Sequence, residues 1–212
     1  PPLPGIDIKI AADGEILARG IGVFRGYRGN QEATDEAIED GWFHTGDIGQ
    51  LDSDGYLKIT GRKKELIVTA GGKNVVPSQL EDSIRAHPLI SQCLVVGDQR
   101  PFVAALITLD AEMLPTWLSN SSLPEMSVAE AAKHPEVLAE LQRAVDRTNS
   151  KVSRAEGIRK FEVLTDDFTI DNDYLTPSMK VKRGKVIADY GNAIDDLYAR
   201  AAADRNAEGS AA

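Results

Sequence analysis

The sequence predicts an α+β fold in which a strand-rich first part is followed by a smaller part of mixed strands and helices. Short alternating or apolar runs separated by turn residues fill the first part. A glycine and four charged residues, Gly61–Glu65, interrupt this pattern, and amphipathic segments then alternate with apolar runs up to residue 202. We therefore expect domains at residues 1–61 and 62–202, with a disordered tail at residues 203–212.

The first part consists of short strands joined by turns. Strands are expected at Ile6–Ile10, Glu15–Arg19, Ile48–Leu51 and Tyr56–Thr60. The intervening turn Asp52–Gly55 favours a hairpin, because Asp-Gly accepts a positive φ at little cost. Residues 34–40 are expected to form a short helix that is capped by Thr34 and stopped by Gly41. Together these elements resemble the last sheet of a domain whose remainder lies outside the chain.

The second part is predicted to be a small α+β domain. Strands are expected at Leu66–Val68, Ser91–Val96, Phe102–Leu109 and Ile158–Leu164. The capping box Ser78–Glu81 predicts the start of a helix that ends near His87 and Pro88. Residues 111–150 are expected to be mostly helical, and residues 186–199 to form a closing helix. An apolar stripe at helical spacing within the first of these segments indicates core packing: Val137, Leu138, Leu141 and Val145.

Composition and charge exclude several classes of protein. The formal net charge is -9 and no long basic run occurs, so the clustered positive surface of a nucleic-acid-binding protein is not expected. No stretch approaches the roughly 18 apolar residues of a transmembrane helix. The segment Pro1–Gly5 lacks the basic start and apolar stretch of a signal peptide, and it resembles a cut inside a longer protein.

The single cysteine and the three histidines give no sign of a metal site or a disulfide. Cys93 lies in an apolar run, which predicts a buried and unreactive thiol. His44, His87 and His134 are too dispersed in the sequence to indicate metal ligands. We expect a reducing, cytoplasmic setting, with a peripheral membrane contact left open.

Three residues near the end of the first part are candidates for nucleotide binding. Asp47 follows Gly46, and its two carboxylate oxygens match the two neighbouring hydroxyls of a ribose, although an Asp that caps a turn fits equally well. Arg62 offers a fork of donors for phosphate or sugar oxygens, or it is a solvated surface residue. Ile59 is a core residue unless a flat base lies against it.

Two features of the second part are candidates for binding and catalysis. Gly71 and Gly72 would let a backbone pass close to a ligand, although a plain turn explains them as well. Lys180 lies in a stretch of period 2, with Met179 and Val181 on the opposite face. Its basic surroundings could hold phosphate or carboxylate oxygens, or they decorate an exposed strand.

Several of these motifs recur in order in one known family. The segments Thr45–Asp47, Asp54–Lys64, Gly71–Pro77 and Leu175–Arg183 together resemble the C-terminal third of adenylate-forming enzymes. That superfamily contains acyl-CoA synthetases, luciferases and the adenylation domains of peptide synthetases. The chain is most similar to the long-chain fatty acyl-CoA synthetases, which also have a long helical insert before Ile158. The resemblance implies the β-rich end of a large ATP-binding domain followed by a mobile C-terminal lid.

The resemblance also implies roles for individual residues. Asp47 matches the acid that holds the ribose hydroxyls of ATP, Ile59 an apolar position near the nucleotide, and Arg62 an arginine that contacts ribose or phosphate. Lys64 falls at the hinge about which the lid rotates. Gly71–Gly72 matches the loop that lines the pantetheine tunnel of CoA after this rotation.

Lys180 matches the lysine that catalyses adenylation in this family. The chain departs from many relatives at Val68, where they carry a second lysine, and at Met179, where they carry glycine. The assignment of Lys180 rests on the spacing of the basic residues up to Arg183, so Lys182 stays a rival candidate. No metal ligand is expected in this chain.

The implied activity is the ATP-dependent conversion of a fatty acid to acyl-AMP, followed by thioester formation with CoA. The fatty acid, ATP, Mg²⁺ and CoA are then the substrates and cofactors, and an N-terminal domain outside the chain supplies the phosphate loop and the Mg²⁺ ligand. This fragment alone is expected to be inactive. Two alternatives are an acyl-AMP ligase that passes the acyl group to a carrier protein, and a binding module without catalysis.

Overall fold

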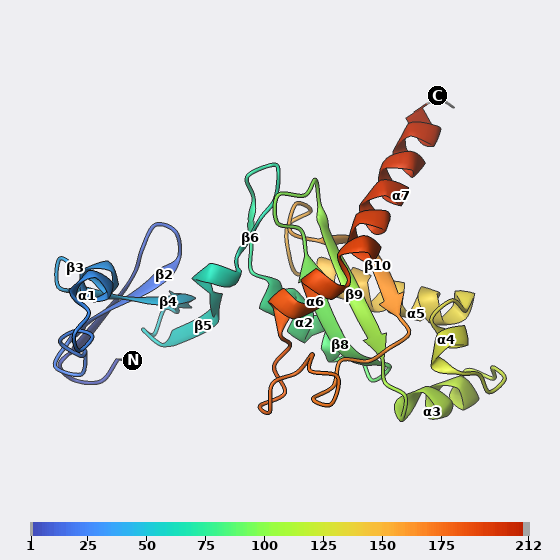
Figure 1. The fold of residues 1–212 in the computed structure, drawn as a ribbon, viewed down its shortest axis with the longest axis horizontal. Coiled ribbons are helices and arrows are strands. Elements are labelled where there is room, and N and C mark those ends of the chain that lie inside the picture. Colours follow the sequence, from blue (N-terminus) through green and yellow to red (C-terminus); the bar gives the residue numbers. More distant parts are fainter. Residues whose placement is uncertain (1, 210–212) are drawn as a thin grey trace. The chain divides into compact units, whose positions relative to one another are not determined.

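The computed structural model describes residues 2–209, with side chains up to residue 204. The chain divides into two compact units, Pro1–Leu66 and Ile67–Ala212 (Figure 1). Sheets and helices occur together in the pattern expected from the sequence, so the predicted α+β class is confirmed. No helix in the described part of the chain is long and apolar enough to cross a membrane.

The first unit is built on one antiparallel sheet. Its strands are β1 (Ile6–Ile10), β2 (Glu15–Gly20), β3 (Ile38–Glu39), β4 (Trp42–Leu51) and β5 (Leu57–Arg62). They are arranged in the order β1-β2-β4-β3, and β5 also pairs with β4. The strand predicted from the alternation in β1 is therefore confirmed, and so is the strand predicted after the Asp-Gly turn, β5. The buried apolar residues of this unit are Ile16, Leu17 and Ile48.

The short helix of the first unit begins earlier than the sequence suggested. Helix α1 spans Gln31–Ala37, and its N-cap is Asn30, whose Oδ1 accepts a hydrogen bond from the backbone N–H of Ala33. The predicted cap at Thr34 is therefore wrong. The Thr34 hydroxyl instead donates to the backbone oxygen of Asn30 and accepts from the backbone N–H of Tyr27, so it lies inside the helix and ties it to the preceding loop.

The second unit has a three-stranded sheet between two apolar layers. The strands β8 (Ile90–Val96), β9 (Val103–Leu109) and β10 (Ile158–Leu164) lie in the order β10-β9-β8, with β9 parallel to β10 and antiparallel to β8. Alternate residues of β9 enter opposite cores: Ala105 and Ile107 face one, Ala104 and Leu106 the other. A sheet covered on both faces explains why these strands are continuously apolar.

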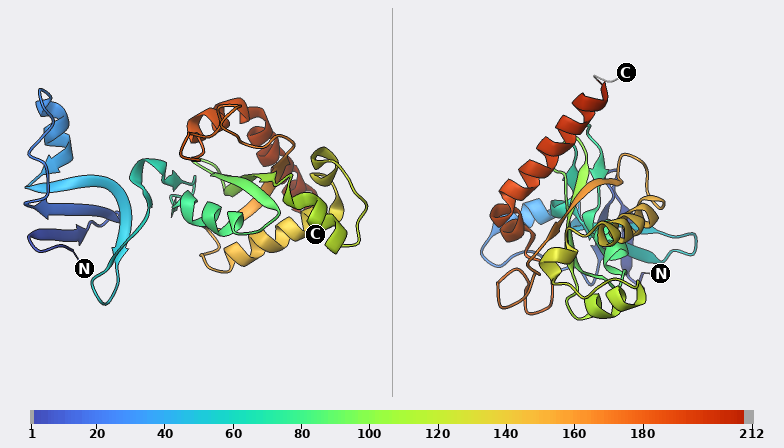
Figure 2. Two further views of the ribbon diagram at one scale, coloured as in Figure 1. Left: turned by 90° about the horizontal axis from the view of Figure 1, so that it is seen from below. Right: turned by 90° about the vertical axis from the view of Figure 1, so that its right-hand side faces the viewer.

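Helices cover both faces of this sheet (Figure 2). One layer contains α2 (Pro77–Arg85), α3 (Met113–Asn120), α4 (Val128–Ala131) and α5 (Pro135–Asn149), and the other contains α6 (Arg183–Asp189) and α7 (Gly191–Gly209). The helices α3 to α5 form the crossover that two parallel strands require. In α5 the predicted stripe is confirmed, because Val137, Leu141 and Val145 are buried.

Two predicted boundaries in the second unit are wrong. Helix α2 begins at Pro77 with Val76 as its N-cap, one residue before Ser78, and the Glu81 carboxylate accepts hydrogen bonds from Val95 and Arg183. Helix α7 runs through Gly209, so residues 203–209 are helical where a disordered tail was expected. The alanine-rich sequence from Ala201 onward explains this, because alanine has the highest helix propensity. Residues 210–212 of the predicted tail lie outside the described residues.

The single thiol behaves as predicted. Cys93 is buried in β8, and burial raises the pKa of its thiol well above the ordinary value. The neutral thiol is therefore the stable form at physiological pH. Since the thiolate is the reactive species, Cys93 is a packing residue.

Candidate functional site

Asp47 and Arg62, which the sequence analysis singled out separately, lie side by side in the first unit. They are directly opposite each other in the β4–β5 ladder, and Arg62 Nη1 donates to Asp47 Oδ1 over 2.7 Å. No second ion-pair partner of Asp47 occurs among the described residues. The pair thus presents a carboxylate oxygen and a guanidinium together at one place, which suits recognition of a sugar next to a phosphate.

The turn before Asp47 is fixed from three directions. Gly46 adopts φ +69, a left-handed conformation that glycine takes at little cost. The Thr45 hydroxyl donates to the backbone oxygen of Ile16 over 2.7 Å and accepts from the backbone N–H of Asp47 over 3.1 Å. The Gly46 N–H donates to Glu15 Oε1 over 2.9 Å. Strand β2 therefore holds the part of β4 that carries Asp47.

Ile59 is not part of the core. It pairs with Gly49 in the β4–β5 ladder, and 61% of its surface is exposed. The interpretation of Ile59 as a core residue is therefore wrong, and the alternative of an apolar surface for a ligand stays open. Strand β5 carries Ile59 and Arg62 three residues apart, within one short segment.

Lys64 lies in the 3-10 helix η1 (Lys63–Glu65), two residues before the end of the first unit. Its side chain is exposed. The neighbouring Lys63 is held firmly, because its Nζ lies 2.8 Å from both Asp13 Oδ2 and Glu15 Oε2. The predicted hinge residue Lys64 therefore directly follows Lys63, a residue that two ion pairs hold in place.

The Gly71–Gly72 loop connects the two short strands β6 (Ile67–Val68) and β7 (Asn74–Val75). Gly72 has φ +76, which explains the glycine at that position. At Gly71 an added Cβ would meet nothing nearer than Thr69 Oγ1 at 3.9 Å. Packing within the chain therefore does not require glycine at Gly71, and the backbone there is open to a close approach by a ligand.

Lys180 lies in a tight hairpin loop, not in the period-2 strand that the sequence suggested. The Lys180 backbone is bonded twice to Thr176: the Thr176 N–H donates to its oxygen over 2.9 Å, and the Lys180 N–H donates to Thr176 Oγ1 over 3.1 Å. Met179 adopts φ +62. A left-handed conformation is one that glycine adopts at lower cost than methionine, and it turns the chain so that the expected alternation of faces is lost.

The rival candidates Lys180 and Lys182 differ in their partners. Lys182 Nζ forms an ion pair with Asp173, and this hydrogen bond lowers the pKa of the Asp173 carboxyl. Lys180 is exposed and has no ion-pair partner in the part of the chain whose side chains are described. The ammonium of Lys180 is therefore the one that is available to an anionic ligand.

The base of this hairpin is anchored by Arg183, the first residue of α6. Arg183 Nη1 donates to the backbone oxygen of Val95 over 2.7 Å, and Nη2 lies 2.5 Å from Glu81 Oε1. Burial raises the pKa of Glu81 above its ordinary value, although the Arg183 charge and the Val95 N–H act in the opposite direction. The hairpin is thus tied to both α2 and β8.

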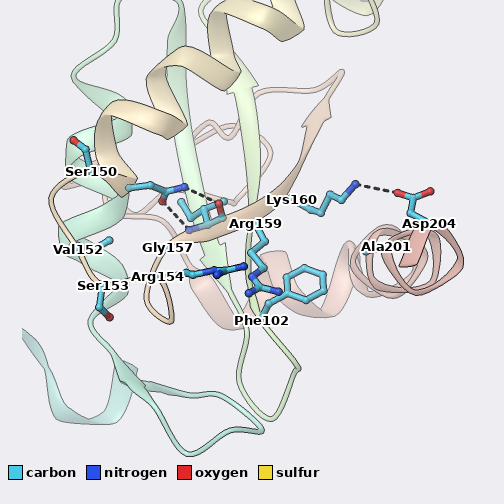
Figure 3. Close-up of a pocket in the computed structure, with 12 residues that line it drawn as sticks. Phe102, Ser150, Val152, Ser153, Arg154, Gly157, Arg159, Lys160, Ala201 and Asp204 are labelled. Carbon is cyan, nitrogen blue, oxygen red and sulfur yellow. Dashed lines mark hydrogen bonds and ion pairs between the residues drawn. The ribbon is translucent and has the colours of Figure 1, made fainter. Parts of the chain in front are cut away.

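A basic pocket that the sequence analysis missed lies at the start of β10. It has a volume of about 950 Å³ and is lined in part by Phe102, Arg154, Arg159 and Lys160. Figure 3 shows the Arg154 and Arg159 side chains extending to the same region beside the Phe102 ring. Neither arginine has an ion-pair partner among the described side chains, whereas Lys160 Nζ lies 3.0 Å from Asp204 Oδ2. The two free guanidinium groups suit a phosphate-bearing ligand.

Side-chain contacts hold one wall of this pocket and join the neighbouring segment to the glycine loop. Asn149 bonds both backbone groups of Ile158 over 2.8 Å, which fixes the end of α5 against β10. Lys73, next to Gly72, forms a 3.2 Å ion pair with Glu156, which directly precedes Gly157 in the pocket lining. The cluster Arg154, Arg159 and Lys160 within seven residues was the available signal in the sequence.

Comparison with known proteins shows the family to which the chain is related. Residues 64–202 match the family described as "AMP-binding enzyme C-terminal domain". The long-chain-fatty-acid–CoA ligase FadD15 of Mycobacterium tuberculosis is 54% identical over 198 residues, which are 93% of this chain and 33% of that protein. The long-chain-fatty-acid–CoA ligase ACSBG2 of Gallus gallus is 41% identical over 207 residues, which are 89% of this chain and 27% of that protein.

A solved structure shows the same fold. The A-PCP didomain of the carboxylic acid reductase from Segniliparus rugosus, in complex with AMP, is 25% identical with a TM-score of 0.72, and the match covers 98% of this chain and 29% of that one. The chain spans about a third of the length of these curated relatives. The expected resemblance is therefore confirmed: the chain belongs to the AMP-binding enzyme C-terminal domain family of adenylate-forming enzymes.

Proposed function

We propose that the chain is the C-terminal third of a long-chain fatty acid–CoA ligase that activates its substrate as acyl-AMP and then forms the CoA thioester. The names of the relatives at 54% and 41% identity support this assignment. The observation that carries the mechanism is the Lys180 ammonium, which has no ion-pair partner among the described side chains and stands on a hairpin whose backbone is fixed by Thr176.

Lys180 acts in the first half-reaction. A fatty carboxylate oxygen attacks the α-phosphorus of ATP, the bond from this phosphorus to the bridging oxygen breaks, and pyrophosphate leaves. Both reactants are anions, so negative charge must be neutralised as they approach. A compact ammonium brought to the reacting oxygens does this, and losing such a contact typically costs about 3–4 kcal/mol in the barrier.

Asp47, Arg62 and Ile59 hold the nucleotide in this proposal. The Asp47 carboxylate accepts from the ribose hydroxyls, and the Arg62 guanidinium contacts ribose or phosphate oxygens. The exposed Ile59 gives the base an apolar surface. The described residues contain no cluster of three or more His, Cys, Asp or Glu side chains that could hold a metal ion, so we assign Mg²⁺ to the rest of the parent enzyme.

CoA is received by the second unit. After the lid rotates about Lys64, the open side of Gly71–Gly72 lines the path of the pantetheine arm. The basic pocket with Arg154 and Arg159 binds the phosphates at the nucleotide end of CoA. The CoA thiolate then attacks the acyl carbonyl carbon, the bond to the AMP oxygen breaks, and AMP leaves. The hinge rotation thus replaces Lys180 by the Gly71–Gly72 loop next to the reacting groups, and each of the two lid positions serves one half-reaction.

The test uses the full-length parent protein with palmitate, MgATP and CoA. The proposal requires pyrophosphate release that depends on the fatty acid, and palmitoyl-CoA and AMP as products when CoA is present. Pyrophosphate release with the acyl group transferred to a carrier protein, and no acyl-CoA, would establish the acyl-AMP ligase instead. Binding of acyl-CoA without any pyrophosphate release would establish a binding module.

A further inference from the structure

Glu15 is a buried carboxylate that the proposed mechanism does not use. Only 3% of its surface is exposed, although it is charged and lies at the start of β2. Its Oε1 accepts from the Gly46 N–H over 2.9 Å, and its Oε2 lies 3.0 Å from His44 Nδ1 and 2.8 Å from Lys63 Nζ. Burying a charge is costly unless it is paired and hydrogen-bonded, so the three contacts explain why Glu15 is stable there.

Two of these three partners directly precede residues of the proposed machinery. Gly46 is followed by Asp47, the proposed ribose ligand, and Lys63 is followed by Lys64, the proposed hinge residue. One carboxylate therefore holds β4 next to Asp47 and holds η1 next to Lys64. Packing of the apolar core alone does not require this arrangement.

We propose that Glu15 is a positioning residue that fixes Asp47 for nucleotide binding and fixes the sheet-side end of the hinge at Lys63. This inference rests on the proposed function of Asp47. The Gly46 N–H bond holds the φ +69 turn, and this turn sets the position of Asp47 opposite Arg62. The Lys63 contact prevents bending before Lys64, so that rotation begins at that residue.

The two contacts can be separated by mutation. In Glu15→Gln the amide oxygen can still accept from Gly46, but the neutral side chain no longer attracts the Lys63 ammonium. Glu15→Leu removes both contacts, whereas Lys63→Met keeps the Gly46 contact and removes the Lys63 contact together with the ion pair between Lys63 and Asp13. Glu39→Gln is the matched control, because Glu39 also lies near His44, with 3.7 Å between His44 Nε2 and Glu39 Oε2, but it is exposed and touches neither Gly46 nor Lys63.

The experiment measures AMP affinity by calorimetry, the KM values for ATP and palmitate, and the Tm of each full-length variant. We expect Glu15→Leu to weaken AMP binding and raise the ATP KM about ten-fold or more, with the palmitate KM within two-fold of wild type. Lys63→Met is expected to leave AMP affinity unchanged and to lower kcat of the complete reaction. Glu39→Gln is expected to match wild type throughout.

Two results would overturn this role. One is a Glu15→Leu enzyme with wild-type AMP affinity. The other is an equal rise of both KM values in Glu15→Gln and Glu15→Leu together with a fall in Tm, which would mark Glu15 as purely structural. A wild-type parent that binds AMP but releases no pyrophosphate would refute the proposed function alone, because the AMP affinities of the variants would still test Glu15.

Discussion

Arg183 and Glu81 form an ion pair that joins the Lys180 hairpin to helix α2. Arg183 Nη2 lies 2.5 Å from Glu81 Oε1, and the same carboxylate oxygen accepts from the Val95 N–H over 2.7 Å. The side chains are only 22% and 13% exposed. Because Arg183 follows Lys180 by three residues, this pair anchors the C-terminal end of the hairpin to the second unit.

The first prediction concerns the stability that this pair provides. Glu81→Gln leaves the Arg183 charge enclosed without a counter-ion, so we expect a loss of about 2–3 kcal/mol in the free energy of unfolding. Asp82→Asn is the matched control, because Asp82 is 68% exposed and its pair with Arg85 is worth less than about 1 kcal/mol. Urea unfolding of the 212-residue chain, followed by Trp117 fluorescence in a Trp42→Phe background, measures both. Equal losses in the two variants would contradict the bracing role.

The second prediction concerns the backbone at Met179. This residue adopts φ +62 and is 56% exposed, so a glycine there would relieve strain and lose little burial. We expect Met179→Gly to leave the unfolding free energy unchanged or raise it by up to about 1 kcal/mol, since the strain relief is partly offset by greater freedom of the unfolded chain. Met179→Val should lower it by about 1–2 kcal/mol, because a β-branched residue tolerates this conformation poorly. Thermal unfolding compares the two variants, and a more stable Val variant would contradict the assigned conformation.

The third prediction concerns the pH dependence of the first unit. Burial by itself raises the pKa of Glu15, but hydrogen bonds from Lys63, His44 and Gly46 outweigh it and lower the pKa below the ordinary value of 4.5. The folded state therefore binds the proton less tightly than the unfolded state does. The resulting stability is fully present above about pH 4.5 and is lost as the pH falls through the folded pKa.

We expect the unfolding free energies of wild type and Glu15→Gln to differ by a constant amount between about pH 7 and pH 5.5, and this difference to shrink below about pH 4.5. Trp42 fluorescence in a Trp117→Phe background reports on the first unit. A difference that stays constant down to pH 3, or that grows, would show that the Glu15 carboxyl is not stabilised in its charged form.

The fourth prediction concerns the basic pocket. In the full-length enzyme, Arg159→Ala removes one of the two unpaired guanidinium groups, so we expect the KM for CoA to rise about ten-fold while pyrophosphate release in the adenylation step is unchanged. Arg143→Ala on α5 is the control, because Arg143 pairs with Glu140 and does not line the pocket. Steady-state kinetics with varied CoA give the answer. An unchanged CoA KM would exclude this pocket as the CoA site.

The elements of the fold could be predicted from local patterns. The apolar run of β9 and the alternation of β1 gave correct strands, and the stripe in α5 gave a correct helix, because burial imposes a fixed period on each. Helix starts were less accurate. Thr34 and Ser78 are both favourable caps, but Asn30 lies four residues before Thr34 and Pro77 one residue before Ser78, and these residues mark the actual starts.

The candidate site was predictable only in part. Asp47 and Arg62 stand fifteen residues apart and meet because a hairpin joins their strands, which the Asp-Gly turn indicated. Glu15 meets Gly46 and Lys63 across 31 and 48 residues, and no local pattern encodes such contacts. The distinction between Lys180 and Lys182 likewise depends on Asp173, whose place is set by the fold of the loop.

The measurement that tests the central claim most directly compares Lys180→Ala and Lys182→Ala in the full-length enzyme, one half-reaction at a time. We predict that Lys180→Ala lowers fatty-acid-dependent pyrophosphate release by roughly 100- to 1000-fold, yet converts supplied palmitoyl-AMP and CoA to palmitoyl-CoA at nearly the wild-type rate. Lys182→Ala should slow adenylation far less, because its ammonium is engaged by Asp173. Equal loss of both half-reactions in Lys180→Ala, or selective loss of adenylation in Lys182→Ala, would contradict the account.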